Sequence, residues 1–264
     1  MLRLEQVSLT FNEGTMDEKQ ALQNADIELK SGEFLTVIGS NGAGKSTLMN
    51  VISGSIIPDT GNIFINEQAV TPMQEYKRSQ MIGRVFQNPS AGTAPSMTIE
   101  ENLSMAWSRN KKRTLKPGVN KKKKELFRDH LQTLNLGLED RMTAKVGLLS
   151  GGERQALSLL MATFTEPDIL MLDEHTAALD PSRAELITGI TADVVEKFQL
   201  TTLMVTHNMQ QALDLGTRLI MMDQGRIILD AAGEEKQNLT IEKLLEEFQR
   251  LRGEKMANDK AVLG

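Results

Sequence analysis

The fold is decided by the stretch Gly39-Ser40-Asn41-Gly42-Ala43-Gly44-Lys45-Ser46-Thr47. It matches G-x-x-x-x-G-K-[ST], the pattern of a phosphate-binding loop, whereas a chance glycine-rich turn is the plain alternative. The apolar run 34–38 predicts a buried strand before the loop, and residues 46–52 predict a helix after it. Glycines let backbone N–H groups approach an anion, and the helix N-terminus adds partial positive charge. We therefore expect Lys45 to reach the β- and γ-phosphates of a nucleotide and the Ser46 hydroxyl to bind Mg²⁺.

Composition narrows the classes of protein that remain. The chain has 264 residues, of which 40% are hydrophobic, so it can bury a substantial core in one large or two small domains. The net charge of −5 argues against a general nucleic-acid binder. The absence of cysteine excludes disulfides, thiolate metal sites and cysteine nucleophiles.

Hydropathy bears on the relation of the chain to membranes. The sequence lacks an apolar run of about 18 residues, the length that crosses a bilayer. Its first residues alternate around the charged Glu5, unlike a signal peptide. We expect a soluble cytoplasmic protein in which any membrane role belongs to partner chains.

Alternating apolar and polar residues predict strands on both sides of the loop. Residues 2–11 are expected to form an edge strand, and residues 25–30 and 62–65 two further strands. Together they predict a mostly antiparallel sheet around the phosphate loop. Phe11 ends the first strand, where it either packs in the core or stacks on an adenine ring.

Two apolar runs that predict buried strands end in polar side chains. Asp173 and Glu174 follow residues 168–172, and His207 follows residues 200–205. Parallel strands have this composition, and ligands of such sheets gather beyond the carboxyl ends of the strands. Asp173 is a candidate to hold Mg²⁺, Glu174 to polarise an attacking water and His207 to contact the γ-phosphate. The alternative is a set of solvated strand ends.

Two further positions are weaker candidates from the residues alone. The turn Ser150-Gly151-Gly152 opens a strongly apolar helix and is a possible second anion site, although capping of that helix by Ser150 explains it equally well. Gln87 ends another candidate strand, residues 81–87, where a glutamine by itself indicates little.

Helical spacing and turn residues complete the assignment. Helices are predicted at residues 100–107, 126–136 and 209–215, and a hairpin joins residues 218–223 to 226–230. An amphipathic helix, expected to pack on the domain or on a partner, is traced by Ile241, Leu244, Leu245, Phe248 and Leu251. Residues after Gly253 are expected to be frayed.

Residues 109–128 are strongly basic, with Glu125 as their acid. The plain interpretation is a solvated loop and helix start, and the alternative is contact with an anionic lipid surface or an acidic partner. RNA is disfavoured because Phe127 is the sole aromatic residue among these charges. The basic residues are Arg109, Lys111, Lys112, Arg113, Lys116, Lys121, Lys122, Lys123, Lys124 and Arg128.

Taken in order, the motifs resemble those of the nucleotide-binding subunit of ABC transporters over about residues 2–230. The most specific element is Leu149-Ser150-Gly151-Gly152-Glu153-Arg154-Gln155, because other phosphate-loop ATPases lack it. The other motifs are residues 39–47, Gln87, 169–174, 177–180 and His207.

The resemblance implies a role for each motif. Phe11 matches the adenine-stacking aromatic, Glu174 the catalytic glutamate and His207 the switch histidine. Gln87 matches the glutamine that touches Mg²⁺ and the attacking water, and Asp180 matches the residue that crosses between subunits. The implied catalytic set is Lys45, Gln87, Glu174 and His207, the metal set Ser46, Gln87 and Asp173, and the nucleotide set Phe11, residues 39–47, Ser150, Gly151, Gly152 and Asp180.

The resemblance also implies the architecture and the partners. It predicts an α/β phosphate-loop NTPase fold of the ABC type in residues 1–233, with a mixed RecA-like core, an antiparallel β subdomain and a helical subdomain at about residues 88–145. Residues 234–264 would form a C-terminal helix and tail. Two copies would pair head to tail around two ATP molecules, on the cytoplasmic face of the cell membrane. Membrane permease subunits and an extracytoplasmic substrate-binding protein would complete the assembly, and nucleic acid is not expected.

The function implied is ATP hydrolysis that powers an importer, with amino acids as a possible cargo. The alternatives are a cytosolic ABC ATPase of iron–sulfur cluster assembly and a non-hydrolysing ATP-binding adaptor, which the presence of Gln87, Glu174 and His207 disfavours. The sequence departs from the family where His175 replaces the usual proline, in the longer segment before Leu22 and in the basic insertion after Trp107.

Overall fold

The phosphate loop follows the central strand of a largely parallel sheet. In this computed structural model, which describes residues 1–109, 111 and 118–250, the sheet has the strand order β10-β9-β3-β8-β7-β6. All its neighbouring pairs are parallel except β9 with β10. Burial on both faces matches the continuous apolar sequences of the inner strands. The strands are β3 (Phe34–Gly39), β6 (Ile82–Val85), β7 (Ile169–Asp173), β8 (Thr202–Val205), β9 (Arg218–Asp223) and β10 (Arg226–Ala232).

A second, antiparallel sheet lies beside the first and has the order β2-β1-β4-β5. The prediction of an edge strand at residues 2–11 is wrong, because β1 pairs with β2 on one side and β4 on the other. The alternation of apolar and polar residues shows that one face of the strand is buried, but it does not show which strands pair with it. The strands are β1 (Leu2–Phe11), β2 (Lys19–Leu29), β4 (Thr60–Ile65) and β5 (Gln68–Ala69).

The prediction that an antiparallel sheet surrounds the phosphate loop is also wrong. The neighbours of β3 are β8 and β9, and both run parallel to it. They come from residues more than a hundred positions further along the chain, so local alternation could not reveal them. The antiparallel sheet instead covers the helix α1 (Lys45–Ser53) from the other side, and one apolar cluster joins Leu48 and Ile52 of α1 to Leu4 and Val37 of the two sheets.

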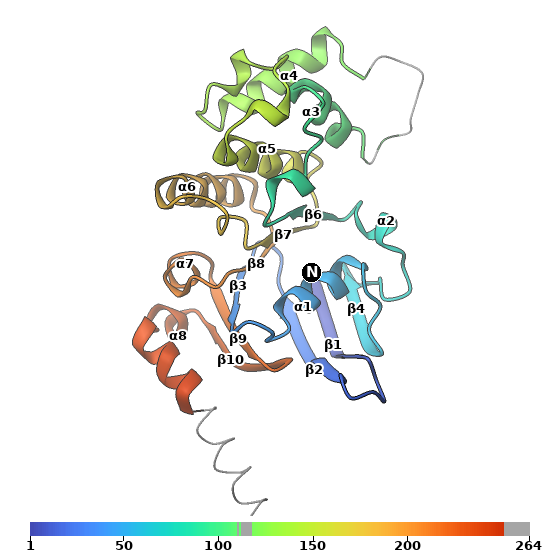
Figure 1. Cartoon of the computed structure of the whole chain (residues 1–264), viewed down its shortest axis with the longest axis vertical. Coiled ribbons are helices and arrows are strands. Elements are labelled where there is room, and N and C mark those ends of the chain that lie inside the picture. The colour runs from blue at the N-terminus through green and yellow to red at the C-terminus, as the bar shows by residue number, and fades with distance from the viewer. Residues whose placement is uncertain (110, 112–117, 251–264) are drawn as a thin grey trace, which may run out of the picture.

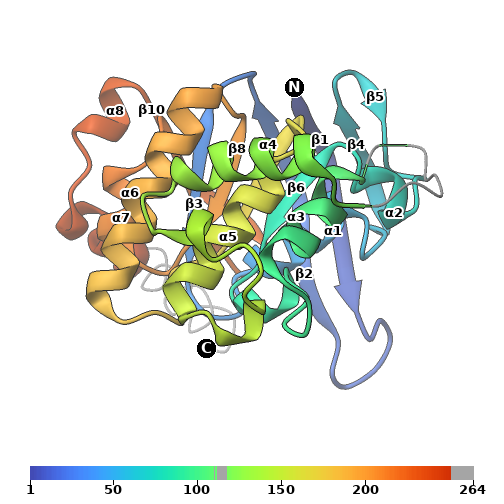
Figure 2. The same ribbon diagram turned by 90° about the horizontal axis from the view of Figure 1, so that it is seen from above.

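Helices form the opposite end of the molecule. Figure 1 places α3, α4 and α5 at one end of its long axis, with β1, β2 and β4 toward the other, and Figure 2 shows the same helices from above. One apolar cluster joins these helices to α6. The bounds are α2 (Glu75–Arg78), α3 (Ile99–Trp107), α4 (Lys121–Gln132), α5 (Gly151–Thr163), α6 (Pro181–Phe198), α7 (Met209–Asp214), α8 (Glu234–Gln237), η1 (Pro89–Ala91), η2 (Leu138–Asp140) and η3 (Val146–Leu148).

The helix predicted at residues 126–136 begins and ends earlier than expected. Asn120 caps α4, since its side chain accepts a hydrogen bond from the Lys123 amide, so the helix includes the lysine run. Asn135 and Gly137 have left-handed φ angles of 53° and 67°, which end the helical path. Apolar spacing could not show this start, because the first turn is made of lysines.

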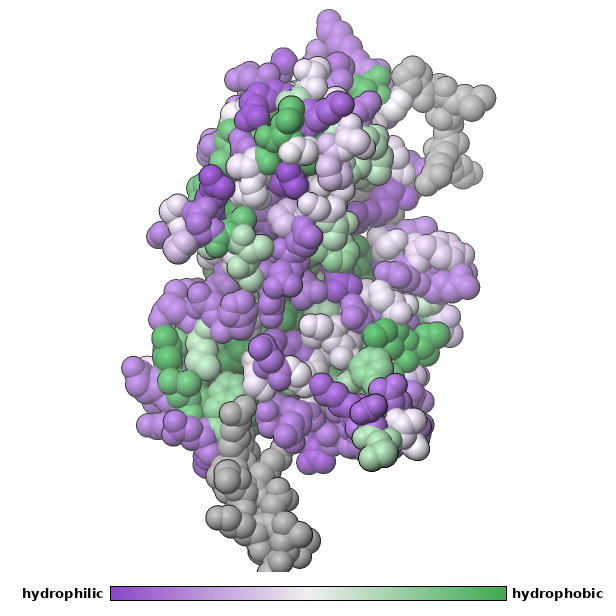
Figure 3. Space-filling view, viewed as in Figure 1, coloured by the Kyte–Doolittle hydropathy of each residue, from purple (hydrophilic) through white to green (hydrophobic). Residues whose placement is uncertain are grey.

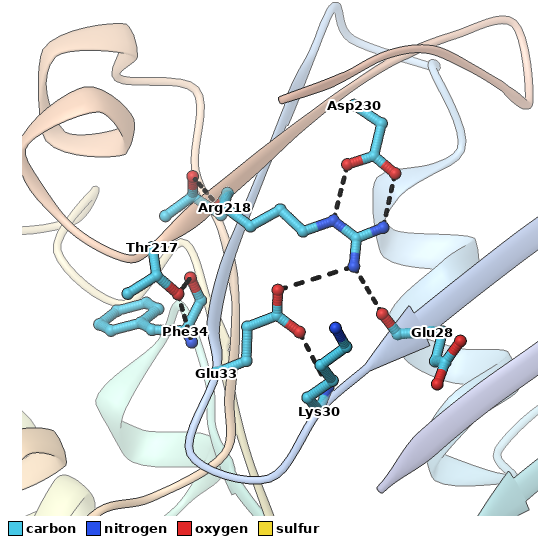
Figure 4. Close-up of polar contacts among 8 residues, drawn as sticks. Glu28, Lys30, Glu33, Phe34, Thr217, Arg218 and Asp230 are labelled. Carbon is cyan, nitrogen blue, oxygen red and sulfur yellow. Dashed lines mark hydrogen bonds and ion pairs between the residues drawn. The ribbon is translucent and has the colours of Figure 1, made fainter. Parts of the chain in front are cut away.

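Arg218 connects the two sheets through its guanidinium group (Figure 4). Its Nε and Nη2 donate to the two carboxylate oxygens of Asp230 on β10, at 2.6 and 2.5 Å. Its Nη1 donates to the Glu28 carbonyl of β2 and lies 3.7 Å from the Glu33 carboxylate. These partners raise the pKa of Arg218 above its ordinary value, chiefly through the Asp230 hydrogen bonds. The β9–β10 hairpin is thereby held against the antiparallel sheet.

Residues 241–250 are helical and pack on the domain. Leu244 is fully buried in a cluster with Ile38 and Met221, whereas Leu245 stays 44% exposed. Hydrophobic side chains gather at the lower left of Figure 3, in the region of α7 and α8. Leu251 and the frayed tail predicted after Gly253 lie outside the described residues, and the division of the chain at residue 233 stays a prediction. Within the described part, the structure contains no helix long and apolar enough to cross a membrane.

Candidate functional site

The phosphate loop wraps around the side chain of Lys45. Its Nζ donates to the Gly39 and Ser40 carbonyls at 2.7 and 3.1 Å, and the residue is 6% exposed. Burial lowers the pKa of Lys45, while the nearby Glu174 and Asp173 carboxylates act in the opposite direction. Gly44 precedes α1 with a φ of 104°, and a Cβ there would lie 2.4 Å from the Ala21 carbonyl oxygen. Only glycine fits this position, so the tight path of the loop is set by its sequence.

Gln87, Glu174 and His207 meet at the carboxyl edge of the parallel sheet. The Gln87 Nε2 donates to Glu174 Oε2 at 3.2 Å, and His207 Nδ1 lies 3.4 Å from the same oxygen. The three residues follow β6, β7 and β8, which are neighbours in the sheet. The sequence predicted all three at strand ends, and the structure places them together beside the phosphate loop.

Asp173 is the last residue of β7 and is engaged by a neighbouring cation. Arg84 on β6 donates from Nη2 to Asp173 Oδ2 at 2.8 Å, and both side chains are largely shielded from solvent. Arg84 was not among the predicted site residues, because only the parallel pairing of β6 with β7 makes it a neighbour of Asp173. A single basic residue in a short apolar strand was the signal that could have drawn attention to it.

The site offers oxygen donors of the kind that Mg²⁺ prefers. They are the exposed Ser46 hydroxyl at the start of α1, the Asp173 carboxylate and the Gln87 amide oxygen. The described residues hold no group of three or more His, Cys, Asp or Glu side chains that could cage a metal ion by themselves. The residues present therefore fit Mg²⁺ bound jointly by a few side chains and substrate phosphates.

Phe11 lies at the end of β1, 37% exposed, and pairs with Lys19 of β2. The Lys19 ammonium approaches the loop closely enough to lie 3.3 Å from a Cβ built on Gly42. Lys19 is thus a second cation at the phosphate loop that the sequence analysis did not single out. The partial exposure of the Phe11 ring fits both interpretations of this residue, core packing and adenine stacking.

Ser150 caps α5 by a reciprocal pair of hydrogen bonds. Its Oγ accepts from the Glu153 amide at 3.3 Å, and the Glu153 carboxylate accepts from the Ser150 amide at 2.7 Å. Gly151 and Gly152 lie beside Leu179 and Arg183 near the start of α6. Figure 1 separates α5 from α1 along the long axis of the molecule. The chain therefore does not bring its Ser-Gly-Gly turn to its own phosphate loop.

Asp180 lies on the same side as that turn and caps α6. Its Oδ1 accepts from the Arg183 amide at 3.2 Å and from the Ser182 hydroxyl at 2.9 Å. These bonds hold the pKa of Asp180 below its ordinary value, the Ser182 hydrogen bond first. Asp180 is exposed, so a second molecule can reach it.

Comparison with known proteins agrees with this geometry. The family described as ABC transporter matches residues 22–177. The tyrosine transport ATP-binding protein of Clostridioides difficile (strain R20291) is 44% identical over 250 residues, which cover 94% of this chain and 99% of that protein. The energy-coupling factor transporter ATP-binding protein EcfA2 of Clostridium tetani (strain Massachusetts / E88) is 31% identical over 87% of this chain and 78% of its own length.

Solved structures give the same result. An ATP-binding cassette of an ABC transporter in its ADP conformation superposes with a TM-score of 0.76, at 28% identity, over 94% of this chain and 98% of that one. A dimeric cassette in a post-hydrolysis state, bound to ADP and Pi, has a TM-score of 0.74 at 26% identity over 88% and 98% of the two chains. The predicted phosphate-loop NTPase fold of the ABC type is confirmed. The chain therefore belongs to the ABC transporter family, as an ATP-binding subunit that hydrolyses ATP.

Proposed function

We propose that this chain is the ATP-hydrolysing motor of a membrane importer and that Glu174 activates the water that attacks ATP. The observation that carries the proposal is the position of the Glu174 carboxylate, held between the Gln87 amide and the His207 ring at the edge of the sheet. A carboxylate fixed in this way beside a phosphate-binding loop can orient a water and accept its proton.

Each remaining residue of the site has a part in this reaction. The backbone N–H groups of residues 39–47 and the Lys45 ammonium would bind the β- and γ-phosphates. Ser46, Asp173 and Gln87 would hold Mg²⁺, which neutralises charge on the phosphate oxygens. The oxygen of the water bonds to the γ-phosphorus, the bond to the β-phosphate oxygen breaks, and His207 contacts the released phosphate. ADP and inorganic phosphate are the products.

We infer that a second copy completes the site. The Ser150-Gly151-Gly152 turn and Asp180 lie together, away from the phosphate loop of their own chain. A head-to-tail pair would place them on the ATP bound by the partner, so that two ATP molecules are enclosed. The solved cassette that is dimeric and bound to ADP and Pi supports this arrangement. The adenine-stacking role of Phe11 belongs to the same proposal.

The membrane partners follow from the family. We propose that permease subunits bind near Gln87 and the helical residues 88–145, so that closure of the ATPase pair moves them. The chain would then be peripheral on the cytoplasmic face, and an extracytoplasmic protein would deliver the cargo. The relative named for tyrosine transport, at 44% identity, supports amino acids, and aromatic ones in particular, as that cargo.

Affinity purification of the tagged chain from mildly solubilised native membranes, followed by mass spectrometry, tests the assignment. We expect hydrophobic permease chains to be recovered together with a substrate-binding protein, and an untagged strain is the control. Recovery of soluble iron–sulfur scaffold proteins without any permease would overturn the transport role. Uptake of labelled tyrosine, compared between the wild-type strain and one that carries Lys45→Ala, tests the cargo separately.

A further inference from the structure

The turn that carries Glu174 is held in an unfavourable backbone conformation. Glu174 has a φ of 44°, in the left-handed region, which costs a residue with a Cβ about 1 kcal/mol or more. Its amide donates to the Val205 carbonyl at 2.9 Å, and its carbonyl accepts from the Ala177 amide at 2.9 Å. These backbone bonds turn the chain away from the direction of β7. The side chains of His175 and Thr176, which follow Glu174, attach this turn to the rest of the domain.

His175 anchors the turn to the buried face of α6. Its side chain is 1% exposed, and its Nε2 lies 3.1 Å from the Thr191 hydroxyl, which is fully buried. The Thr191 hydroxyl donates its single proton to the Ile187 carbonyl at 2.7 Å. His175 must therefore be the donor, with the proton on Nε2. Burial lowers the pKa of His175 to about 4, so the ring is neutral at pH 7. The sequence departs from the family at this position, and a side-chain hydrogen bond here replaces the rigidity that a proline ring would give.

Gln211 on α7 ties the same turn to α6 and to the strand end before His207. Its Nε2 donates to Thr176 Oγ1 at 3.2 Å and to Thr188 Oγ1 at 3.0 Å. Its Oε1 accepts from the Thr206 hydroxyl at 2.8 Å. The Thr188 hydroxyl is already committed as a donor to the Ala184 carbonyl, which fixes the orientation of the amide.

From these contacts we propose that His175 and Gln211 are positioning residues. They join three parts of the chain into one unit: the turn of residues 174–177, the end of β8 next to His207, and α6. The proposal rests on the roles proposed above for Glu174 and His207. Because α6 starts directly after Asp180, a partner subunit that engages Asp180 would move or steady Glu174 and His207 together. In the described part of the chain, the side chains of His175 and Gln211 form their hydrogen bonds with threonine hydroxyls and not with Glu174 or His207. Their loss would therefore act on geometry.

Gln211→Met is the sharpest test, because it keeps the length of the side chain and removes all three hydrogen bonds. We expect kcat for ATP to fall about 10- to 100-fold, the range that misplacement of a catalytic group by a fraction of an ångström to an ångström produces. KM and ATP affinity should change by less than about twofold, because the phosphate loop is untouched. Gln210→Met is the matched control. Gln210 lies on the same helix, and in the described part of the chain its side chain donates a hydrogen bond to Asp214, outside the network of Gln211.

His175 is tested by rescue and by a double-mutant cycle. His175→Leu should lower kcat with KM unchanged, whereas His175→Gln, whose amide can still donate to Thr191, should recover most of it. Thr191→Val should have a similar effect to His175→Leu, and the double variant should be no worse than either single variant. All rates are compared at equal folded fraction, measured by circular dichroism below the unfolding transition.

The outcomes separate this inference from the proposed function. Unchanged kcat in Gln211→Met and His175→Leu, with Glu174→Gln inactive, would overturn the positioning role and leave the chemistry standing. Full turnover in Glu174→Gln would overturn the proposed function itself. A fall in ATP affinity equal to the fall in kcat would also overturn the inference, since it would indicate a general loss of structure instead of misplaced catalytic groups.

Discussion

At the scale of single residues, the site is built from side chains placed at the ends of neighbouring strands. The sequence predicted that Asp173, Glu174 and His207 share one edge of a sheet, because the ends of apolar runs in parallel sheets meet there. It could not predict the Arg84–Asp173 ion pair or the contacts of Gln211, because these depend on which strands and helices become neighbours. The motif residues that carry the chemistry can be predicted from the sequence. The residues that hold them in place cannot, because their contacts form only in the folded chain.

Glu174→Gln should abolish turnover and retain ATP binding. The amide cannot accept the proton of the attacking water, and loss of a general base typically costs about 10²–10⁴-fold in kcat. Phosphate release and ATP affinity by fluorescence titration measure the two effects. Lys45→Ala is the contrasting variant and should lose ATP binding, since it removes the buried ammonium from the loop. Near-normal turnover in Glu174→Gln would contradict the role of Glu174. Full ATP affinity in Lys45→Ala would contradict the assignment of residues 39–47 as a phosphate-binding loop.

His175 should make the protein less stable as the pH falls from 6.5 to 4. Burial lowers the pKa of His175 to about 4, whereas in the unfolded chain it is about 6.5. In this window only the unfolded state binds the proton, so the free energy of unfolding decreases with falling pH, by about 3 kcal/mol at most. Urea unfolding at pH 7 and pH 4.5 measures it, and His175→Gln should lose that part of the pH dependence. An identical pH dependence in both proteins would show that His175 does not titrate on unfolding.

At the scale of elements, capping residues and long-range pairing limit what periodicity can predict. The β3 strand and the helix α1 were predicted nearly to their ends, because the loop motif marks the boundary between them. The start of α4 was missed, because lysines and an asparagine cap carry no apolar signal. The neighbours of β1 and β3 were wrong, because strand pairing joins segments far apart in the chain.

Arg218→Met should destabilise the protein by about 1.5–3 kcal/mol, the range for hydrogen bonds to charged groups. It removes the bidentate bond to Asp230 and the bond to the Glu28 carbonyl, which together hold the β9–β10 hairpin to β2 (Figure 4). The midpoint of urea unfolding measures the loss. Arg226→Met on the same hairpin is the control and should cost less than about 1 kcal/mol, because the exposed Arg226 bonds a neutral glutamine, Gln23. Equal losses in the two variants would remove the structural role assigned to Arg218.

The lysine run at the start of α4 is expected to contact an anionic lipid surface. Lys121, Lys122, Lys123 and Lys124 lie at the helix N-terminus, where the helix dipole disfavours cations, in a chain whose net charge is −5. Each lysine near such a surface contributes about 1 kcal/mol. Replacing the four by glutamine should therefore lower co-sedimentation with phosphatidylglycerol vesicles more than tenfold. Residues 110 and 112–117 of the predicted basic segment lie outside the described part of the chain.

Vesicles of phosphatidylcholine should bind neither protein. The matched control replaces four exposed lysines elsewhere, Lys30, Lys77, Lys145 and Lys197, by glutamine, which gives the same change in net charge. Equal binding by the two quadruple variants would mean that the position of the lysines on α4 does not matter, and the plain interpretation of a solvated helix start would stand.

At the scale of the whole molecule, the motifs of the proposed site lie in two separate places on one chain, and the head-to-tail pair proposed above would bring them together. The phosphate loop, Glu174 and His207 lie at the edge of the central sheet, and the Ser150 turn lies at the start of α5, away from α1 in Figure 1. The family resemblance predicted that the phosphate loop and the Ser150 turn of one chain lie apart, because in a head-to-tail pair each contacts a different ATP molecule. Composition and periodicity could not, because a contact between two copies leaves no periodic pattern in either.

Glu174→Gln should form an ATP-dependent dimer, because ATP enclosed between two copies is no longer hydrolysed. Light scattering after size exclusion should give twice the chain mass of 29.3 kDa with Mg-ATP, and the single mass without it. Ser150→Asp, added to this variant, keeps an N-cap for α5 but sets a carboxylate against the γ-phosphate of the partner, so the dimer should disappear. Thr98→Asp makes the same kind of exchange at the capping box of α3 and should leave the dimer intact. A dimer that survives Ser150→Asp would contradict the contact between the Ser150 turn and the partner's ATP. A monomer in every condition would contradict the head-to-tail pair.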